Sequence, residues 1–344
     1  MTPHQDTLLV TIAFSSFDAS YAKLEELYPG LEIIHYNTKD VDIVPPEVWS
    51  RTTIHLTLYL FPQTRDQVPK LKWVHLYSGG INQALNAPLL HDKDIIWTRN
   101  GGVHAPQIGE WAMSALLAYY RQLPTMLDWQ KSETWRAAEY RPRGDLLGKT
   151  IGFLGYGAIA RHTARIASAC GMRVLAYTLH EKKTLEQRRS KTFTPERTGD
   201  PAGEIPEEWY SGDLNDFLSL GLDVLVISLP STDKTRHSMG KQQFELLRDC
   251  FLINLARGDI IQTDDLVTAL NDGVLRGAAL DVTDPEPLPD GHPLWSAKNT
   301  IITPHTSGVS DEYMPRTIDI LDANLKRLQA GEELLNLVLR ADGY

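Results

Sequence analysis

Three charged or titratable side chains follow strand-like segments in the second half of the sequence. They are Arg257 in "INLARGD", Glu286 in "LDVTDPEP" and His305 in "IITPHTSG". A guanidinium group binds a carboxylate through two parallel hydrogen bonds and polarises an adjacent carbonyl. A buried carboxylate beside an imidazole favours the charged imidazolium, which is the proton donor that reduction of a ketone requires. Together with a glycine turn of the dinucleotide-binding kind upstream, at 151–160, the three residues indicate hydride chemistry on a 2-oxo or 2-hydroxy acid.

Each of these residues also has an ordinary structural interpretation. An arginine before a glycine is common at strand ends, a glutamate between prolines is often a surface carboxylate, and a lone histidine is more often structural than catalytic. Their shared position beyond strand ends favours a site, because open α/β sheets bind ligands there. Asp281 ends a strand in the same way, and it would either face a nicotinamide carboxamide or bond a loop.

The stretch "IGFLGYGAIA" at 151–160 has the pattern of a dinucleotide-binding turn. Gly155 permits a tight turn after a strand, and Gly157 lets the backbone approach a pyrophosphate at a helix N-terminus. Ala160 replaces the third glycine of the usual pattern. An ordinary turn is the alternative, but the strand, helix and second strand around the motif favour dinucleotide binding. We expect these turn residues to contact the cofactor: Gly155, Tyr156, Gly157, Ala158 and Ile159.

The segment after the second strand of this series bears on the choice of cofactor. Sites specific for NAD(H) place a carboxylate there to bind the ribose hydroxyls, whereas this strand ends in Thr178. Residues 173–191 hold six basic side chains against two acidic ones, in a chain of formal net charge −10. Lys182 and Lys183 would accept a 2′-phosphate, and a solvated helix face is the alternative. The pattern favours NADP(H) over NAD(H).

The order of apolar segments predicts an α/β fold with two doubly wound parallel sheets. Short apolar runs alternate with helical stretches over the first hundred residues, and a second series begins at 150. Such alternation is typical of parallel sheets covered by helices on both faces. Six runs in the second series fit a Rossmann domain. The expected strands are 8–14, 31–37, 53–60, 71–77 and 94–100, then 150–155, 172–178, 222–229, 250–256, 277–282 and 299–304.

Helical periodicity sets the predicted domain bounds. Residues 104–122 carry apolar side chains at helical spacing, so we expect a helix buried between domains or against a second subunit. A last helix at 310–330 should return to the first domain, and the insert at 181–212 is interpreted as a surface excursion. We therefore predict a flavodoxin-like substrate domain from residues 1–101 and 306–344, and a dinucleotide-binding domain from residues 102–305.

Composition and charge argue against several classes of partner. The chain has 344 residues, of which 42% are hydrophobic and 23% charged, as in ordinary globular proteins. Its net charge of −10 disfavours nucleic acid and anionic membranes. Cys170 and Cys250 offer no disulfide framework and no metal-ligand spacing. No signal peptide or transmembrane run is recognised, so we expect a cytoplasmic protein. We expect no bound metal.

The motifs from about 100 to 308 resemble those of D-isomer-specific 2-hydroxyacid dehydrogenases of the glyoxylate/hydroxypyruvate reductase kind. Besides the glycine turn they are "LVISLPSTDKTRHSMG", "FLINLARGDIIQTDDLVTAL", "GAALDVTDPEPLPDGHPLW" and "ITPHTSG". The resemblance implies that Arg257 binds the substrate carboxylate and 2-oxygen. It also implies that Glu286 pairs with His305, which acts as the acid/base.

The resemblance implies further contacts with substrate and cofactor. "YSGG" at 77–80 is similar to the family's substrate loop, so Ser78, Gly79 and Gly80 should meet the carboxylate. An NAD(P)-dependent enzyme acting on a small 2-oxo or D-2-hydroxy acid is implied, as is a homodimer that involves the helix at 104–122. The remaining expected cofactor contacts are Leu229, Pro230, Thr235, Leu255, Ala256, Asp281 and Gly308.

Two other functions stay open. Transcriptional corepressors that resemble this family are non-enzymatic scaffolds that sense a dinucleotide, and they can keep the same three residues. Formate dehydrogenases also resemble the family but carry glutamine where Glu286 stands, which disfavours them. Turnover of a 2-oxo acid with oxidation of the cofactor separates an enzyme from a scaffold.

Overall fold

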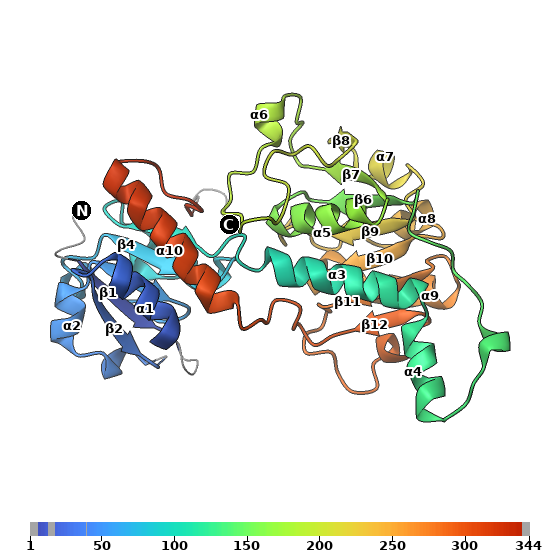
Figure 1. The fold of residues 1–344 in the computed structure, drawn as a ribbon, viewed down its shortest axis with the longest axis horizontal. Coiled ribbons are helices and arrows are strands. Elements are labelled where there is room, and N and C mark those ends of the chain that lie inside the picture. Colours follow the sequence, from blue (N-terminus) through green and yellow to red (C-terminus); the bar gives the residue numbers. More distant parts are fainter. Residues whose placement is uncertain (1–5, 13–17, 39, 339–344) are drawn as a thin grey trace. The chain divides into compact units, whose positions relative to one another are not determined.

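The computed structural model describes residues 6–12, 18–38 and 40–338, and its chain divides into two compact units (Figure 1). Each unit has its own parallel sheet, which confirms the predicted α/β class. The segment 191–195 groups with unit 1 although it lies within the sequence of unit 2. The predicted domain bounds remain predictions. Unit 1 comprises residues 1–104, 191–195 and 310–344, and unit 2 comprises residues 105–190 and 196–309.

Unit 1 is built on a five-stranded sheet. All neighbours pair in parallel in the order β2-β1-β3-β4-β5, which is the flavodoxin order. Each predicted strand of the first series overlaps one strand of this sheet. The apolar runs of the three inner strands, β1, β3 and β4, are buried on both faces, as is typical of parallel sheets. The strands are β1 (Thr7–Thr11), β2 (Glu32–Tyr36), β3 (Ile54–Thr57), β4 (Trp73–Leu76) and β5 (Ile96–Arg99).

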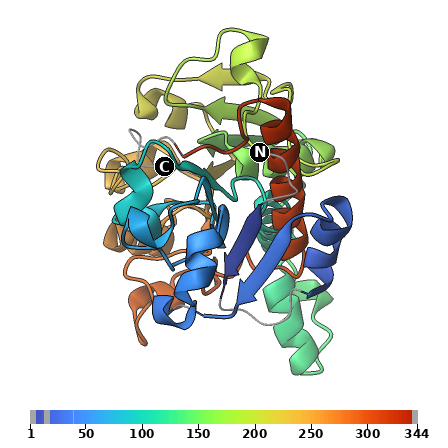
Figure 2. The ribbon, with the colours of Figure 1, turned by 90° about the vertical axis from the view of Figure 1, so that its left-hand side faces the viewer.

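Helices cover both faces of this sheet. Helices α1 (Asp18–Leu27) and α10 (Tyr313–Ala330) lie side by side on one face (Figure 2), where Leu24 and Ile318 join one buried cluster. Gly331, with φ of 70°, ends α10 in the left-handed conformation that glycine adopts readily. The other face is covered by α2 (Pro46–Arg51) and by short 3-10 helices at Val41–Ile43, Arg65–Gln67, Asn82–Ala84 and Pro88–His91.

Unit 2 is built on a seven-stranded parallel sheet. Its order is β12-β11-β10-β9-β6-β7-β8, so the chain order reverses between β6 and β9. This is the Rossmann order extended by one strand. The strands are β6 (Thr150–Leu154), β7 (Arg173–Tyr177), β8 (Glu208–Tyr210), β9 (Val224–Ile227), β10 (Phe251–Asn254), β11 (Gly277–Leu280) and β12 (Thr300–Ile302).

The helices of unit 2 lie on both faces of its sheet. Helices α3 and α5 pack side by side on one face (Figure 1) and share a buried cluster with the strands. The second cluster lies under α7, α8 and α9. The helices are α3 (Ala105–Tyr120), α4 (Leu123–Lys131), α5 (Ala158–Ala169), α6 (Leu185–Arg188), α7 (Leu214–Leu218), α8 (Lys241–Leu246) and α9 (Thr263–Asn271), with 3-10 helices at Ala137–Glu139, Gly258–Ile260 and Pro293–Ser296.

The insert contains an edge strand, so the prediction of six strands in this unit was wrong. Strand β8 has three residues and pairs with β7, which is too short to show an apolar pattern among prolines and glycines. The insert is also anchored to α5. The Arg161 guanidinium donates to the carbonyls of Asp200 and Arg188, at 2.6 Å each, and the Tyr156 hydroxyl donates to the Asp200 carboxylate at 3.0 Å.

Two buried histidines on β3 and β4 make the stability of unit 1 depend on pH. Burial lowers the pKa of His55 to about 3 and that of His75 to about 4. The Nε2 of His75 lies 2.8 Å from Asn100 Oδ1, and its Nδ1 lies 2.7 Å from the Thr98 hydroxyl. The amide oxygen accepts from Nε2–H, so Nδ1 accepts from the hydroxyl and the ring is neutral.

We expect the free energy of unfolding to fall as the pH drops from about 6.5 to about 4. The unfolded chain takes up a proton on each histidine in this range, whereas the folded chain does not until lower pH. The two rings together give a slope of about 2–3 kcal/mol per pH unit near pH 5. Urea denaturation at pH 7 and pH 5 measures the loss. His75→Gln should remove about half of the part of this slope that the two histidines contribute. If the free energy of unfolding of the variant falls with pH as steeply as that of wild type, His75 is not a source of the pH dependence.

Candidate active site

The carboxyl ends of three neighbouring strands of unit 2 carry the predicted catalytic residues. Strands β10, β11 and β12 pair side by side in parallel, so their carboxyl ends meet at one edge of the sheet. Arg257 follows β10, Glu286 stands in the loop after β11, and His305 follows β12. The fold therefore places all three on the edge where open α/β sheets bind ligands.

His305 and Glu286 form a hydrogen-bonded pair. The Nδ1 atom of His305 lies 2.6 Å from Oε1 of Glu286. A carboxylate only accepts, so Nδ1 carries the proton and Nε2 is the nitrogen left for a substrate. The side chains are 48% and 41% exposed, so the expectation of a buried carboxylate was wrong. The bond fixes the tautomer and the orientation of the ring.

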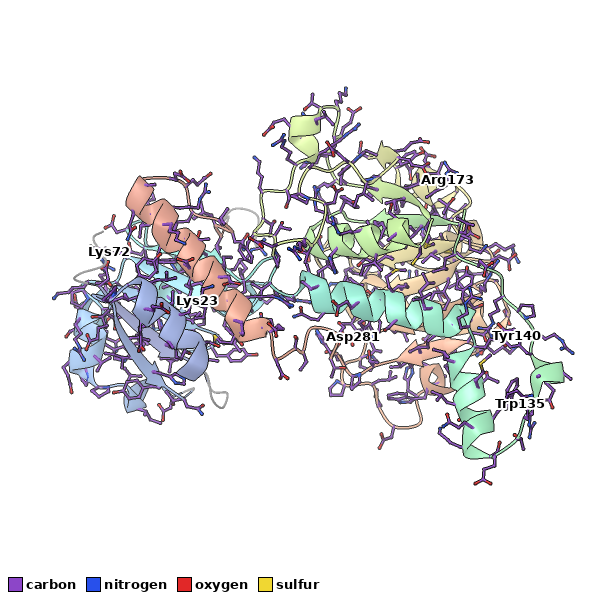
Figure 3. All side chains as sticks on the ribbon, in the orientation of Figure 1. Lys23, Lys72, Trp135, Tyr140, Arg173 and Asp281 are labelled. Carbon is purple, nitrogen blue, oxygen red and sulfur yellow. The ribbon has the colours of Figure 1, made fainter. Side chains whose placement is uncertain are left out.

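Asp281, which is labelled in Figure 3, binds the loop on which His305 stands. The residue is 2% exposed, and its carboxylate accepts from the Thr303 hydroxyl at 2.6 Å and from the amides of Thr306 and Ser307 at 2.9–3.1 Å. The Ser307 hydroxyl donates to the same carboxylate. These bonds satisfy a buried charge that would otherwise be destabilising. Contact with a nicotinamide carboxamide stays a prediction.

The backbone at His305 is itself unusual. Its φ is 54°, a left-handed conformation that few non-glycine residues adopt. The His305 amide donates to the Asp281 carbonyl at 2.9 Å. Strained residues of this kind persist only where surrounding bonds hold them, and they gather at functional sites.

A close backbone approach joins the loops that carry Arg257 and Glu286. A Cβ added at Gly258 would overlap the carbonyl of Thr283, so only glycine fits beside the loop after β11. The Thr263 hydroxyl donates to the Asp284 carbonyl at 2.7 Å. Arg257 is exposed, and its Nη1 donates to the Ala256 carbonyl at 2.6 Å. Its Nε and Nη2 are left to bind a carboxylate through two parallel hydrogen bonds.

The glycine turn begins α5 at the point where the strand order reverses. Gly155 has a φ of 90°, which favours glycine, and Gly157 is the residue before the helix. No side chain caps this helix. A Cβ added at Gly157 would meet nothing within 4 Å. The open space and the uncapped helix N-terminus fit a pyrophosphate group.

The other expected cofactor residues follow the strands of the same edge. Leu229 and Pro230 come after β9, Leu255 and Ala256 after β10, and Gly308 stands in the loop after β12. The Thr235 hydroxyl donates to the Pro230 carbonyl at 2.7 Å and so closes the loop after β9. Their common edge is shown by the fold, and their contacts with a cofactor stay predictions.

The segment after β7 is less basic in effect than its composition suggests. Arg173 begins β7, so it lies at the opposite edge of the sheet from the glycine turn (Figure 3). The Nζ of Lys183 lies 3.0 Å from the Glu181 carboxylate. The Thr178 hydroxyl donates to the His180 carbonyl at 2.8 Å. Lys182 and Lys183 are the basic residues of this stretch that follow the end of β7 most closely in the chain, so they stay the candidates to bind a 2′-phosphate.

The predicted substrate loop of unit 1 follows β4 and turns its carbonyls inward. The Tyr77 carbonyl accepts from Asn100 Nδ2 at 2.9 Å and from the Tyr313 hydroxyl at 2.6 Å. Burial raises the pKa of Tyr313, which keeps this hydroxyl protonated. Among the described residues, the amides of Ser78, Gly79 and Gly80 have no hydrogen-bond partner. Three consecutive unpaired amides fit an anion.

Sequence reasoning missed several residues that hold these loops. Asn100, Tyr313 and Arg99 bind the loop at 77–80, and Thr303 and Ser307 bind Asp281. The only signal for Arg99 was its position at the carboxyl end of β5, beside the strand that leads into the loop. The others come from sequence-distant contacts or from loop residues of ordinary type.

Two negative findings limit what else the described part of the chain holds. None of its helices has the length and apolarity to cross a membrane. Its histidines, cysteines and carboxylates nowhere gather in a group of three or more that would hold a metal ion.

Comparison with known proteins places these features in a family. The sequence model described as "D-isomer specific 2-hydroxyacid dehydrogenase, NAD binding domain" matches residues 113–307. A glyoxylate reductase of Aeropyrum pernix is 31% identical over 80% of this chain and 78% of its own length. A hydroxypyruvate reductase of Blautia hydrogenotrophica is 29% identical over 77% of this chain and 78% of its own length.

A solved structure gives the same comparison at the level of the fold. A D-isomer specific 2-hydroxyacid dehydrogenase of Xanthobacter autotrophicus, in complex with NADPH and MES, superposes with a TM-score of 0.75. The two chains are 25% identical, and the match covers 99% of this chain and 100% of the other.

Replacing Gly157 with alanine tests the cofactor assignment without disturbing the fold. The added methyl group meets no protein atom within 4 Å, so the melting temperature should stay within about 2 °C of wild type. The same methyl group would stand where a pyrophosphate approaches, so the Kd for the dinucleotide should rise about tenfold or more. Fluorescence titration with reduced dinucleotide measures it. Gly258→Ala is the contrast and should lower the melting temperature. An unchanged Kd in Gly157→Ala would place the dinucleotide elsewhere.

Proposed function

Because the chain belongs to the D-isomer specific 2-hydroxyacid dehydrogenase family, we propose that it reduces a small 2-oxo acid to the D-2-hydroxy acid with His305 as acid/base. The observation that carries the proposal is the 2.6 Å bond between His305 Nδ1 and Glu286. The two residues lie beyond the carboxyl ends of the strands, as does the glycine turn that begins α5 and is suited to a dinucleotide.

The proposed roles follow from the chemistry of the residues. Arg257 binds the substrate carboxylate and polarises the 2-oxygen, and the amides of Gly79 and Gly80 also bind the carboxylate. The dinucleotide, when bound, supplies the hydride that adds to the carbonyl carbon. His305 gives the proton on Nε2 to the carbonyl oxygen, while Glu286 keeps the proton on Nδ1 and stabilises the charged ring. The oxidation of a 2-hydroxy acid runs the same steps in reverse.

A panel of acids tests this function. Glyoxylate, hydroxypyruvate and larger 2-oxo acids are offered with NADH and with NADPH, and the absorbance of the reduced nicotinamide is followed. Formate with the oxidised dinucleotides is the control for the disfavoured alternative. Oxidation of cofactor by at least one 2-oxo acid, with a D-2-hydroxy acid as product, is expected. Dinucleotide binding without any turnover would favour the non-enzymatic scaffold.

Replacement of His305 and Glu286 should separate proton transfer from binding. His305→Gln removes the donor, so turnover should fall about 10²–10⁴-fold while the Kd for the dinucleotide changes little. Glu286→Gln removes the carboxylate that favours the charged ring, so the alkaline midpoint of the pH–rate profile for reduction should move to lower pH.

A matched control lies two residues away. Asp284 forms a similar exposed pair with His237, with Oδ2 at 3.6 Å from Nε2. Asp284→Asn therefore removes a neighbouring carboxylate of the same kind and should leave the pH–rate profile unchanged. If the profile of Glu286→Gln superimposes on that of Asp284→Asn, the role given to Glu286 is refuted.

We further propose that the protein prefers NADP(H) to NAD(H). The end of β7 carries Thr178, which neither binds two ribose hydroxyls nor repels a phosphate as a carboxylate would. Lys182 and Lys183 follow it, although Glu181 neutralises part of this charge through its 3.0 Å pair with Lys183. The Xanthobacter relative was solved with NADPH, which agrees with the proposal but concerns that protein.

The ratio of kcat/KM for NADPH to that for NADH measures this preference. It should exceed one at low salt, shrink as salt screens the contact, and fall in Lys182→Ala/Lys183→Ala. Arg173→Ala is the control, because Arg173 is equally basic but begins β7 at the far edge. A ratio below one in wild type, or an equal loss in Arg173→Ala, would show that the stretch is only a solvated surface.

We also propose a homodimer, with a changed account of its interface. The helix predicted at 104–122 is buried within unit 2, against α5 and the sheet, so its apolar character needs no second subunit. The arm that follows it is the more apolar surface. Trp135 is 96% exposed (Figure 3), and exposed leucines precede it in α4 at Leu123 and Leu127.

Light scattering at micromolar concentration should give the mass of two chains. Leu127→Ser/Trp135→Ser should shift the mass toward one chain, because these side chains would lose apolar contact area. Trp295→Ser, at another exposed tryptophan of unit 2, should not. The mass of one chain for the wild-type protein would refute the dimer.

A further inference from the structure

Arg99 binds the loop that the proposed function assigns to the substrate carboxylate. It is the last residue of β5, and β5 lies beside β4, which continues into residues 77–80. The guanidinium is half-buried, and its Nη1 donates to the Gly79 carbonyl at 2.6 Å. The proposed mechanism gives Arg99 no part.

The bond to Gly79 fixes the direction of a neighbouring amide. The Gly79 carbonyl and the Gly80 N–H belong to one planar trans peptide unit and point in opposite directions. Holding the carbonyl on Arg99 therefore turns the Gly80 N–H away from Arg99. A charged donor on the carbonyl also polarises the peptide and strengthens the N–H as a donor.

The other carbonyls of the loop are also bound by protein donors, which leaves backbone N–H groups of the loop for a ligand. The Ser78 carbonyl accepts from the Asn100 amide at 2.9 Å, and the Gly80 carbonyl accepts from the Ser78 hydroxyl at 2.7 Å. A Cβ at Gly79 would overlap the ring of His104, so the ring packs directly on the loop. With every carbonyl from 77 to 80 occupied, the backbone groups of the loop that are left for a ligand are the N–H groups of Ser78, Gly79 and Gly80.

Arg99 is held in place by a residue near the end of the described chain. Its amide donates to the Asn336 carbonyl at 3.1 Å, and its carbonyl accepts from Asn336 Nδ2 at 3.0 Å. The Asn336 side-chain oxygen accepts from the Phe193 amide at 3.1 Å. The amide and the carbonyl of Arg99 are thus both bound by Asn336, which fixes the backbone position from which the side chain reaches Gly79.

We propose that Arg99 is a positioning residue for the substrate carboxylate, acting by orienting and polarising the peptide between Gly79 and Gly80. The inference rests on the proposed function, because that function assigns the carboxylate to these amides. Amides that bind the carboxylate do so equally in the ground state and the transition state, so losing their orientation should weaken binding and leave the chemical step unchanged.

Variants at Arg99 with a matched control test the proposal. Arg99→Met removes the donor, and Arg99→Lys restores a charged donor of different shape. Arg65→Met is the control, because Arg65 is also half-buried in unit 1 and donates Nη1 to a backbone carbonyl, that of Leu71, at 2.7 Å. The measurements are KM and kcat for glyoxylate, the Kd for NADPH, and oxamate binding by calorimetry with saturating dinucleotide.

Arg99→Met should raise KM for glyoxylate about tenfold to a hundredfold, with kcat within about threefold of wild type and the Kd for NADPH unchanged. Arg99→Lys should recover part of the loss, and Arg65→Met should behave as wild type. Equal KM values in Arg99→Met and Arg65→Met would overturn the proposal, as would a fall in kcat at unchanged KM. If Arg99→Met does not fold, Arg99→Lys decides, and a wild-type KM in that variant overturns the proposal.

The failure of the proposed function would look different. If the wild-type protein turns over no 2-oxo acid, the proposed function fails, and oxamate binding alone then decides the role of Arg99. Binding that is weaker in Arg99→Met than in Arg65→Met supports the role. Equal binding in the two variants, or no binding to the wild-type protein, overturns it.

Discussion

In a parallel sheet all strands run in the same direction. The chain must therefore cross a face of the sheet after each strand before the next strand can begin. Both sheets of this protein obey that constraint at every pair. Residues as distant in sequence as Gly157 and His305 consequently stand beyond the same edge of one sheet. Where the strand order reverses, between β6 and β9, neighbouring loops diverge and leave the glycine turn uncovered.

Side-chain bonds to backbone groups then give the loops beyond these edges their shape. In unit 2 the buried carboxylate of Asp281 binds the amides of Thr306 and Ser307, and His305, directly before them, has a left-handed backbone conformation. In unit 1 the side chains donate to backbone carbonyls, whereas in unit 2 a carboxylate accepts from backbone amides. Arg99 and Asn100 take the carbonyls of the loop at 77–80 and leave its amides unpaired. A carboxylate thus organises the loop with the acid/base candidate, and donors organise the loop with the anion-binding candidate.

The sequence predicted what depends on local pattern. Continuous apolar runs marked the strands of both sheets, and the glycines of 151–160 marked the turn after β6, because burial and backbone conformation restrict residue types there. It also placed Arg257, Glu286 and His305 beyond strand ends, where the structure has them. What it missed depends on contacts between distant segments. Strand β8 is three residues long and exists by pairing with β7. The bonds of Arg99 and Asp281 join loops that no spacing rule connects, and the exposure of Glu286 depends on loop paths.

Unit 1 draws its residues from both ends of the chain, which sets an order on its synthesis. Met314, Ile318 and Leu321 of α10 complete the buried cluster that begins with Leu8 and Val10 of β1. A ribosome delivers these partners some three hundred residues apart, and delivers all of unit 2 in between. The second unit can therefore close its sheet during translation, while the apolar face of the first remains uncovered until the final helix emerges. The apolar face of the N-terminal strands thus lacks its covering helix for as long as the residues of unit 2 are being synthesised.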